Sequence, residues 1–401
     1  MVSGAGSMVI PDDVLAEILK RLPVKSLCRF KCVSTLWRSL ISDPHFVHSH
    51  FARSAIHPKL LISLPSQPDP DPPGRCFFAA NQSEPGNPDQ PRIALPYFFA
   101  PGTASRYVSQ SLNGLICFQV DGYVGVCNPT TGKYVTLRTI EAKITGECAY
   151  LHYSFGFDPV DKKHKVLRTL ATCRRSMPDD LREVIMEHHV LDLGSDKWRR
   201  IEDGPPHIKK ESEICFDGLI YYRAWNGTIT NPRQDYLVEF NVRTERFRMV
   251  RFPGDNGPRG GHCKICLIEF EGHVAVADLR NLKRDGNDDV VLLISEDFER
   301  EIWRKKVIAL PPPWKEILAA EEIFLAGTVG TGEWLLASQI MSKPQRVFYY
   351  NPKNNSFHEI EISGLPEYKR VLPPAVWQTF THHVESLVPL EGLHERQLHL
   401  T

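Results

Sequence analysis

The sequence has no excess of charge, since its 401 residues include 48 basic and 48 acidic side chains. A chain without net charge has no long-range field that would gather nucleic acid or anionic lipid at its surface. It also lacks an apolar run of the roughly 18 residues that a membrane-spanning helix needs, and its first residues lack the basic start and apolar core of a signal peptide. These absences disfavour nucleic-acid and membrane partners and predict a protein of the cytoplasm, the nucleus or both.

A metal or cofactor site is also not indicated. The ten cysteines are scattered among β-like segments, and in a reducing compartment most are expected to be small buried apolar side chains. Cys263 and Cys266, with His262 and His273 nearby, have the chemistry to bind zinc, but structural zinc sites need four ligands on firm spacing and no second cysteine pair occurs. The acidic run 285–289 lacks the glycine and glutamate of a helix-loop-helix calcium site. We therefore expect no metal and no cofactor.

Signatures of catalysis are missing as well. The glycine-rich segment 327–332 opens no predicted helix, so it lacks the amide-lined helix start that holds phosphates. No Gly-x-Ser-x-Gly nucleophile motif occurs. The adjacent pairs His188 with His189 and His382 with His383 lie in alternating strands, where one of each pair faces in and the other out. No catalytic residue is therefore predicted.

The helical part of the sequence is confined to residues 10–51. A first helix with one apolar stripe begins at Pro11, with acidic residues at its start and basic residues at its end that complement the helix dipole. Pro23 ends it, a second short helix follows, and a third begins near Ser34 and is ended by the Asp43-Pro44 pair. Three such helices make a core too small to be stable alone, so either the rest of the chain or another molecule must cover part of it.

The remainder of the sequence has the pattern of strands and turns, with short runs of Val, Ile, Phe, Tyr and Leu divided by Gly, Asn, Asp and Pro. Six turns share one plan, in which an acidic residue or its amide precedes a charged tight turn and usually an aromatic residue. All but the second follow an alternating strand, as the loop of a β-hairpin does. The last three begin 55 residues apart, which matches one propeller blade, so the sequence predicts an irregular β-propeller of about six blades. The six turns are 128–134, 158–164, 192–198, 241–247, 296–303 and 351–357.

Two further features set the predicted limits of this β domain. The last strand-like run, 380–388, can pair with the first, 59–64, which would close the ring without an unpaired edge. Residues 65–91 contain eight prolines and almost no apolar periodicity outside Cys76 to Ala80, which predicts that most of this stretch is a mobile surface loop. The predicted α+β organisation is a small three-helix module over residues 1–53 followed by an all-β, propeller-like domain over residues 54–401.

The helical module contains four sequence motifs in this order, and none of the four is missing: Ile10-Pro-Asp-Asp-Val-Leu, Leu22-Pro-Val-Lys-Ser-Leu, Arg29-Phe-Lys-Cys-Val and Trp37-Arg. In type and order they closely resemble the F-box of plant F-box proteins. The resemblance implies docking on a Skp-type adaptor and, through it, on a cullin. The adaptor interface is then expected to use Ile10, Pro11, Leu15, Ile18, Leu19, Leu22, Pro23, Leu27, Val33, Trp37 and Leu40.

The β domain, from about residue 60 to residue 390, resembles the F-box-associated domain of plant proteins, a relative of kelch propellers. The strings Asn113-Gly-Leu-Ile-Cys-Phe, Phe155-Gly-Phe-Asp-Pro and His383-Val-Glu-Ser-Leu carry this resemblance, and insertions near 174–184, 226–235 and 281–289 depart from it. It implies a non-catalytic subunit of a Skp-cullin-F-box ubiquitin ligase, whose propeller holds a target protein while a separate enzyme transfers ubiquitin.

The target is expected to bind residues on propeller loops, because rigid scaffolds present recognition residues on loops and Trp and Arg are favoured anchors. The sequence offers Arg223, Trp225, Arg233 and Arg259 in loop-like or strand-edge positions. An alternative interpretation is that Trp225 packs between blades and the arginines are solvated.

Two other functions remain open from the sequence. A propeller enzyme of the hydrolase or oxidase type would need clustered acidic, tyrosine or metal-binding side chains at the central mouth, and the sequence indicates no such cluster. An F-box protein can also act as a scaffold without ubiquitination.

Overall fold

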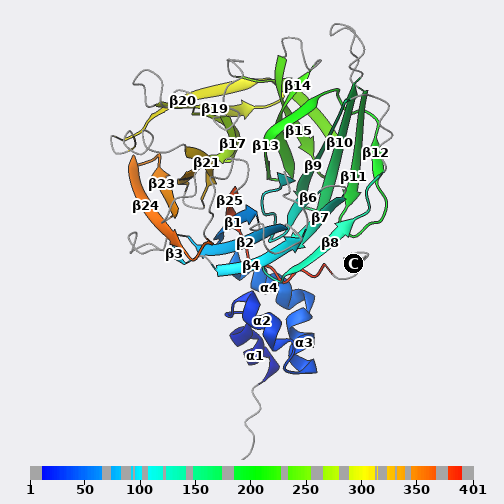
Figure 1. Ribbon diagram of the computed structural model, residues 1–401, viewed down its shortest axis with the longest axis vertical. Coiled ribbons are helices and arrows are strands. Elements are labelled where there is room, and N and C mark those ends of the chain that lie inside the picture. The colour runs from blue at the N-terminus through cyan, green and yellow to red at the C-terminus, as the bar shows by residue number, and fades with distance from the viewer. Residues whose placement is uncertain are drawn as a thin grey trace, which may run out of the picture.

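The computed structural model describes residues 11–65, 74–82, 92–93, 95–101, 107–120, 123–140, 148–173, 185–226, 234–253, 265–279, 289–311, 314, 323–329, 332–338, 345–366 and 378–390. Over these residues, four short helices are followed by strands that form six sheets around a common centre (Figure 1). The predicted combination of a small helical module with a six-bladed propeller is thereby confirmed.

The helices are α1 (Asp12–Leu19), α2 (Val24–Phe30), α3 (Thr35–Ser42) and α4 (Pro44–Ser54). The fourth was not predicted, because the Asp43-Pro44 pair was interpreted as a stop. In the structure this pair begins a helix: the Asp43 carboxylate accepts hydrogen bonds from the backbone N–H groups of His45, at 2.8 Å, and Phe46, at 3.1 Å. Pro44, the first helical residue, has no N–H group to satisfy, and its fixed φ suits that position.

The core of the helical module is built from side chains of all four helices, including the buried Leu19, Leu27, Ile41 and Phe46. Trp37 is half-buried, and its ring meets that of Phe30 edge-on, with the centroids 5.0 Å apart. Aromatic pairs in this geometry add stability beyond that of the buried area. Trp37 is therefore a structural residue of the module.

The six blades are antiparallel sheets, each ordered from the strand nearest the centre to the outermost one. The first blade consists of β25 (Gln378–His383), β1 (Lys59–Pro65), β2 (Gly74–Asn81) and β4 (Leu95–Pro101), and the second of β5 (Tyr107–Val108), β6 (Ile116–Val120), β7 (Tyr123–Asn128) and β8 (Lys133–Leu137). The third consists of β9 (Cys148–Asp158), β10 (Lys163–Cys173), β11 (Ile185–Asp192) and β12 (Arg199–Ile201), and the fourth of β13 (Ile208–Phe216), β14 (Leu219–Asn226), β15 (Gln234–Asn241) and β16 (Arg246–Arg251). The fifth consists of β17 (Ile265–Phe270), β18 (His273–Asp278), β19 (Asp289–Asp297) and β20 (Ile302–Ala309), and the sixth of β21 (Ile323–Thr328), β22 (Trp334–Ser338), β23 (Gln345–Asn351) and β24 (Ser356–Ser363), with β3 (Arg92–Ile93) added at its edge.

The ring is closed between its first and last blades, as predicted. Strand β25 pairs antiparallel with β1, and Ile62 lies opposite Thr379 in the register. A second closure lies at the outer edge, where β3 pairs in parallel with β24 of the last blade. The paired run ends at His383, so residues 384–388, predicted as part of the closing strand, follow a different course.

All six predicted turns connect adjacent antiparallel strands. In four of them, which begin at Asn128, Asp158, Asn241 and Asn351, the side chain of the leading residue accepts hydrogen bonds from backbone N–H groups further along the turn. Asn241, for example, accepts from the N–H groups of Arg243 and Thr244 at 3.0 and 2.8 Å. The turn that begins at Asp158 is also a hairpin, between β9 and β10, although no alternating strand marks it in the sequence. The reason is that β9 is buried on both faces, with Tyr153, Ser154 and Phe155 all covered.

The predicted loop 65–91 is interrupted by strand β2, which lies between β1 and β4. Phe77 and Ala80 of β2 are fully or almost fully buried. The prolines that suggested a loop flank this short apolar segment, and they concealed a strand that the sheet buries on both sides. The rest of the predicted loop, apart from Pro65 and Gln82, lies outside the described residues.

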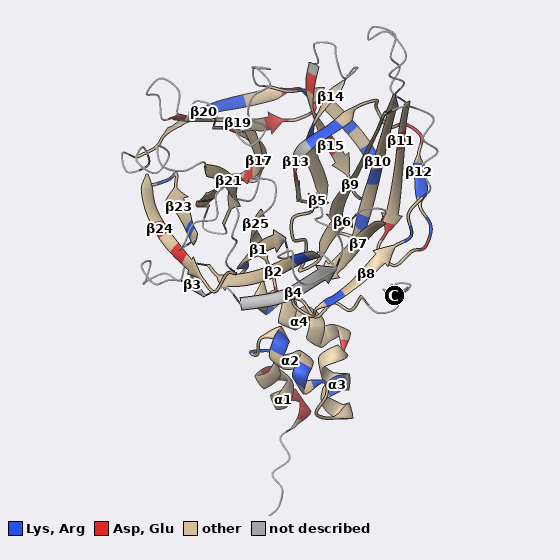
Figure 2. Ribbon diagram, in the orientation of Figure 1, with Lys and Arg blue, Asp and Glu red and all other residues tan. Residues whose placement is uncertain are grey.

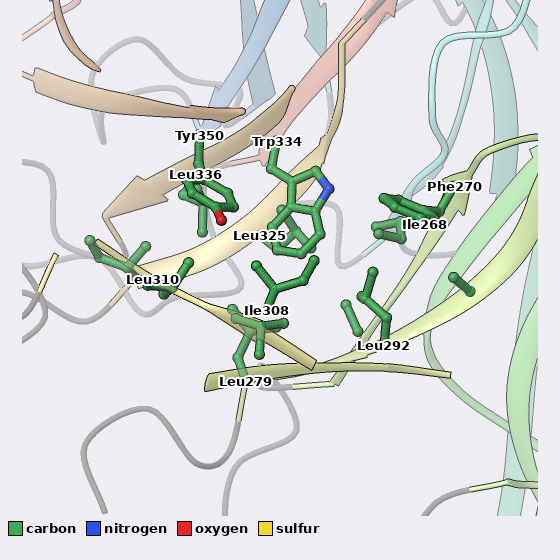
Figure 3. Packing of buried hydrophobic residues seen from close by; sticks show 14 of the residues in the cluster. Ile268, Phe270, Leu279, Leu292, Ile308, Leu310, Leu325, Trp334, Leu336 and Tyr350 are labelled. Carbon is green, nitrogen blue, oxygen red and sulfur yellow. The ribbon is translucent and has the colours of Figure 1, made fainter. Parts of the chain in front are cut away.

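Neighbouring blades pack through apolar side chains on their faces. The largest cluster joins the blade β17–β20 to the blade β21–β24 and is centred on the fully buried Trp334 (Figure 3). The Trp334 ring packs edge-on against Tyr350, with 5.6 Å between the ring centroids. Such seams hold the blades as one rigid ring.

We expect Trp37→Ala to unfold the helices while the propeller remains folded. Truncating a core Trp typically costs about 3–5 kcal/mol, which is comparable to the stability of so small a module. Far-ultraviolet circular dichroism should show loss of the helical signal with the β signal retained. Leu36→Ala, which truncates the exposed neighbour of Trp37, is the matched control and should preserve both signals. Loss of the β signal in Trp37→Ala would contradict the prediction.

Candidate functional site

The tight turns of several blades gather on one face of the propeller. His164 Nε2 lies 3.0 Å from the backbone oxygen of Leu112, which joins the start of β10 to the turn after β5. Lys165 Nζ donates to Glu245 Oε1 over 2.7 Å, which joins the same region to the β15–β16 turn. We call this side the turn face; its members are the turns 112–115, 128–133, 158–163, 216–219 and 241–246.

The helical module is attached to the turn face. Helix α4 leads directly into β1, whose first residue, Lys59, pairs with His383. The ring of His383 lies 2.8 Å from Ser111 Oγ and 3.2 Å from Thr130 Oγ1, and Thr130 belongs to the β7–β8 turn. Figure 1 shows the helices grouped outside the ring, next to β2 and β4. The strand ends away from these turns form the opposite face.

The predicted adaptor residues divide into three groups by burial. Pro11, Ile18, Pro23 and Val33 are exposed and available to a partner. Leu19 and Leu27 are buried in the module core and shape the surface only indirectly. The half-buried residues are Leu15, Leu22, Trp37 and Leu40, and Ile10 lies outside the described residues.

Two exposed apolar residues are not among the predicted adaptor residues. Val14 is 46% exposed and Leu36 is 50% exposed, although helical periodicity places them on the apolar stripes of the first and third helices. Val14 lies one helical turn before Ile18, so the two share one face of α1. Of the nine exposed large hydrophobic residues in the described part of the chain, four lie between the start of α1 and the end of α3: Val14, Ile18, Val33 and Leu36.

The surface of the helical module is basic. Arg21, Lys25, Arg29 and Arg38 are exposed, and Figure 2 shows basic positions on α2 and α3. A surface that combines exposed apolar side chains with exposed basic side chains is complementary to a protein partner that has an apolar groove with an acidic rim.

The predicted target residues have different roles. Arg223 lies within β14, not in a loop, and is only 8% exposed. Its Nη2 donates to Asp235 Oδ2 over 2.7 Å, and its guanidinium lies 4.4 Å from the centroid of the Phe252 ring. Arg223 therefore joins β14 to β15 and cannot serve as a free anchor.

Trp225 is half-buried near the end of β14, on the opposite face. Lys210 Nζ lies 5.4 Å from the centroid of its ring, within the range of a cation–π contact. Arg233 and Arg259 lie outside the described residues and stay predictions.

A cavity of about 1300 Å³ lies at the centre of the ring. Side chains from all six innermost strands, β25, β5, β9, β13, β17 and β21, line it. Lys209, at its wall, donates to Ser154 Oγ over 2.6 Å, which joins β13 to β9 of the neighbouring blade, and it pairs with Glu213 of its own strand.

A family model of the F-box domain matches residues 9–49, and one described as an F-box associated beta propeller domain matches residues 74–384, more than half of the chain. The chain belongs to this family of F-box proteins. It is 29% identical to the F-box protein DOR of Arabidopsis thaliana over 379 residues, covering 90% of this chain and 89% of that protein. It is 32% identical to the Arabidopsis F-box protein At1g53790 over 375 residues, covering 90% and 78% of the two chains.

The propeller of this F-box protein contains histidines that are kept neutral by burial. His188 and His207 stack between two blades with their ring centroids 5.3 Å apart, and burial lowers the pKa of His188 to about 4 and that of His207 to about 3. Burial likewise lowers the pKa of His164 and of His383 to about 4. These side chains serve the packing of the blades and not proton transfer near neutral pH.

Within the described residues of the F-box protein, no group of three or more His, Cys, Asp and Glu side chains is arranged to hold a metal ion. Cys266 and His273 of the zinc alternative lie in β17 and β18, while His262 and Cys263 lie outside the described residues. None of the described helices has the length and apolar character needed to span a membrane.

We expect the F-box protein to lose stability as the pH falls below neutral. In the unfolded chain histidines bind protons near pH 6.5, whereas in the folded protein the buried ones do so only near pH 4 or below. The unfolded state therefore binds more protons between these values, and stability decreases from pH 6.5 towards pH 4. The midpoint of thermal unfolding should be lower at pH 5 than at pH 7.

The variant His207→Gln tests whether the buried histidines cause this pH dependence, since it removes one of them. Its melting temperature should depend less steeply on pH than that of the unaltered protein. A midpoint that stays constant or rises on acidification would contradict the assignment.

Proposed function

We propose that this F-box protein is the substrate-recognition subunit of a Skp-cullin-F-box ubiquitin ligase. The match of residues 9–49 to the F-box domain, with exposed apolar residues on its helices, is the observation that carries the proposal. An F-box implies a Skp-type adaptor as partner, and a propeller joined to it implies a target protein. The chain would act as a non-catalytic subunit that increases the local concentration of the target near a separate transferring enzyme.

The adaptor surface would include α1 and the start of α3. Ile18 and Leu36 combine exposure with large apolar side chains, and the exposed Pro23 before α2 lies between them in sequence. Interfaces gain most of their energy from a few such anchors that become fully buried on binding. The neighbouring arginines and lysines would improve electrostatic complementarity and speed association with an acidic partner.

The target surface would lie on the opposite face of the propeller. Trp225 and Lys210 belong to it in the described part of the chain, and the longer connections after β14 and β16 leave from the same side. A target held there would not compete with the adaptor for space, because the F-box occupies the turn face. Propellers use the loops of one face in this way because the packed blades fix their position.

The adaptor interface can be tested with Ile18→Ala combined with Leu36→Ala. Removing two anchors should weaken binding to a Skp-type adaptor by at least two decades, because each buried apolar side chain contributes about 1.5–3 kcal/mol. Isothermal titration or surface plasmon resonance with the purified adaptor measures the change.

Val160→Ala is the matched control for this double variant, since Val160 is also an exposed apolar residue but lies on a propeller turn. It should bind the adaptor as tightly as the unaltered protein. Unchanged affinity in the Ile18 and Leu36 double variant would refute the proposed interface.

The target surface can be tested with Trp225→Ala combined with Arg233→Ala and Arg259→Ala. Proximity labelling in cells with the proteasome inhibited should lose the proteins that the unaltered chain enriches, because the anchors of the target are removed. Adaptor binding and the melting temperature of the propeller should be preserved. Arg223 stays unaltered in this variant, because its loss would remove one of the two basic partners, Arg223 and Lys210, that pair with the buried Asp235.

The adaptor-deficient double variant is the complementary control in the same experiment. It should still enrich the target proteins but should not promote their ubiquitination. If the triple variant enriches the same proteins as the unaltered chain, the target surface lies elsewhere. If the enriched proteins are never ubiquitinated, the protein acts as a scaffold.

A further inference from the structure

Residues 384–390, which follow the closing strand β25, run between the propeller and the F-box helices. They form no strand or helix, yet six of the seven are buried or half-buried in this contact or against the blades. The paired run of the ring ends at His383, so this segment is not needed for closure. We call residues 384–390 the strap.

Leu387 of the strap completes the core of the F-box helices. It is 3% exposed and packs in one cluster with Leu19, Val24, Leu27 and Ile41. Small helical modules bury too little surface to be stable alone, so one added leucine is a large share of the core. The apolar surface that the sequence required to be covered is thus partly covered by a residue at the far end of the same chain.

Glu385 of the strap holds the same helices through polar contacts. Its Oε2 accepts a hydrogen bond from the backbone N–H of Val24, the first residue of α2, over 3.2 Å. Its Oε1 lies 2.5 Å from Lys59 Nζ, at the start of β1. One buried carboxylate therefore satisfies an N–H group that α2 cannot satisfy internally and ties it to the first strand of the propeller.

The strap is fixed to the propeller at several points. Asn128 Nδ2 donates to the backbone oxygens of Ser386, at 2.9 Å, and Val388, at 3.2 Å. Gly114, at φ +81°, leaves room for the strap, since a Cβ there would overlap Ser386 Cβ and the oxygen of Val384. Leu390 is buried in the apolar cluster between the second and third blades.

We propose that the strap sets the orientation of the F-box on the propeller, and that Glu385 and Leu387 are positioning residues of the ligase subunit proposed above. The proposal rests on that function in one respect: the fixed orientation would keep a constant distance between the adaptor and the target. Because Leu387 is a core residue of the helices while its neighbours are bonded to the blades, the F-box cannot rotate without removing Leu387 from its site.

Amide hydrogen exchange of the full chain tests the strap without any partner. Exchange of core amides reports the free energy of local opening. Leu387→Ala should increase exchange throughout α1–α4 by tenfold or more, with β6 and β7 unchanged. Leu387→Met, which nearly conserves the volume, should restore protection. Val388→Ala is the matched control, because Val388 packs against the propeller cluster and not against the helices.

Glu385→Ala keeps the proposal testable if Leu387→Ala unfolds the whole chain. It should increase exchange of the first turn of α2 several-fold while β6 and β7 remain protected. Small-angle scattering of Leu387→Ala bound to the adaptor should also show a larger maximum dimension than the unaltered complex, and Leu387→Met should not.

Unchanged helix exchange in Leu387→Ala or in Glu385→Ala would overturn the proposal, and so would an equal increase in Val388→Ala. The adaptor affinity of the unaltered chain is measured separately. If that chain does not bind the adaptor, the proposed function fails while the exchange experiment still decides the strap. If it binds and the variants show no change in exchange or dimension, the strap alone fails.

Discussion

The pairing of β25 with β1 is the contact on which the rest of the structure depends. It brings residues more than 300 positions apart into one sheet and removes the unpaired edge that an open ring would expose. It also places the chain that leaves β25 next to the chain that enters β1 from α4. The F-box helices and the strap therefore meet on the same side of the propeller, and their contact follows from the closure of the ring.

Features governed by local chemistry were predicted well from the sequence. The side chains of the turn residues Asn128, Asn241 and Asn351 accept hydrogen bonds from backbone N–H groups two or three positions further along the chain. Such bonds depend only on residues close in the sequence, so they can be predicted without knowledge of the fold. Helix α4 and strand β2 were missed for a different reason. The Asp43-Pro44 pair can end one helix and begin another, and only the packing of Phe46 into the module core decides between the two.

The candidate site was predictable in composition but not in detail. Helical periodicity identifies an apolar stripe, yet it does not say which of its members a partner covers. Leu19 and Val14 belong to one stripe, but Leu19 is buried and Val14 is exposed, because Leu387 and the other helices cover only one side of α1. Arg223 shows the same limit, since Asp235, on the adjacent strand β15, converts a candidate anchor into a buried ion pair.

A recognition subunit that acts by proximity needs a fixed geometry more than it needs reactive groups. In this protein the blade seams fix the propeller, the F-box joins its turn face, and Trp225, the target candidate in the described part of the chain, lies at the other end of its strand. In the proposed function, a flexible linker between the two units would spread the target over many positions and lower its effective concentration at the transferring enzyme. Only a few residues separate α4 from β1, and Glu385 bridges α2 to Lys59, so the two domains are joined in a way that restricts that motion.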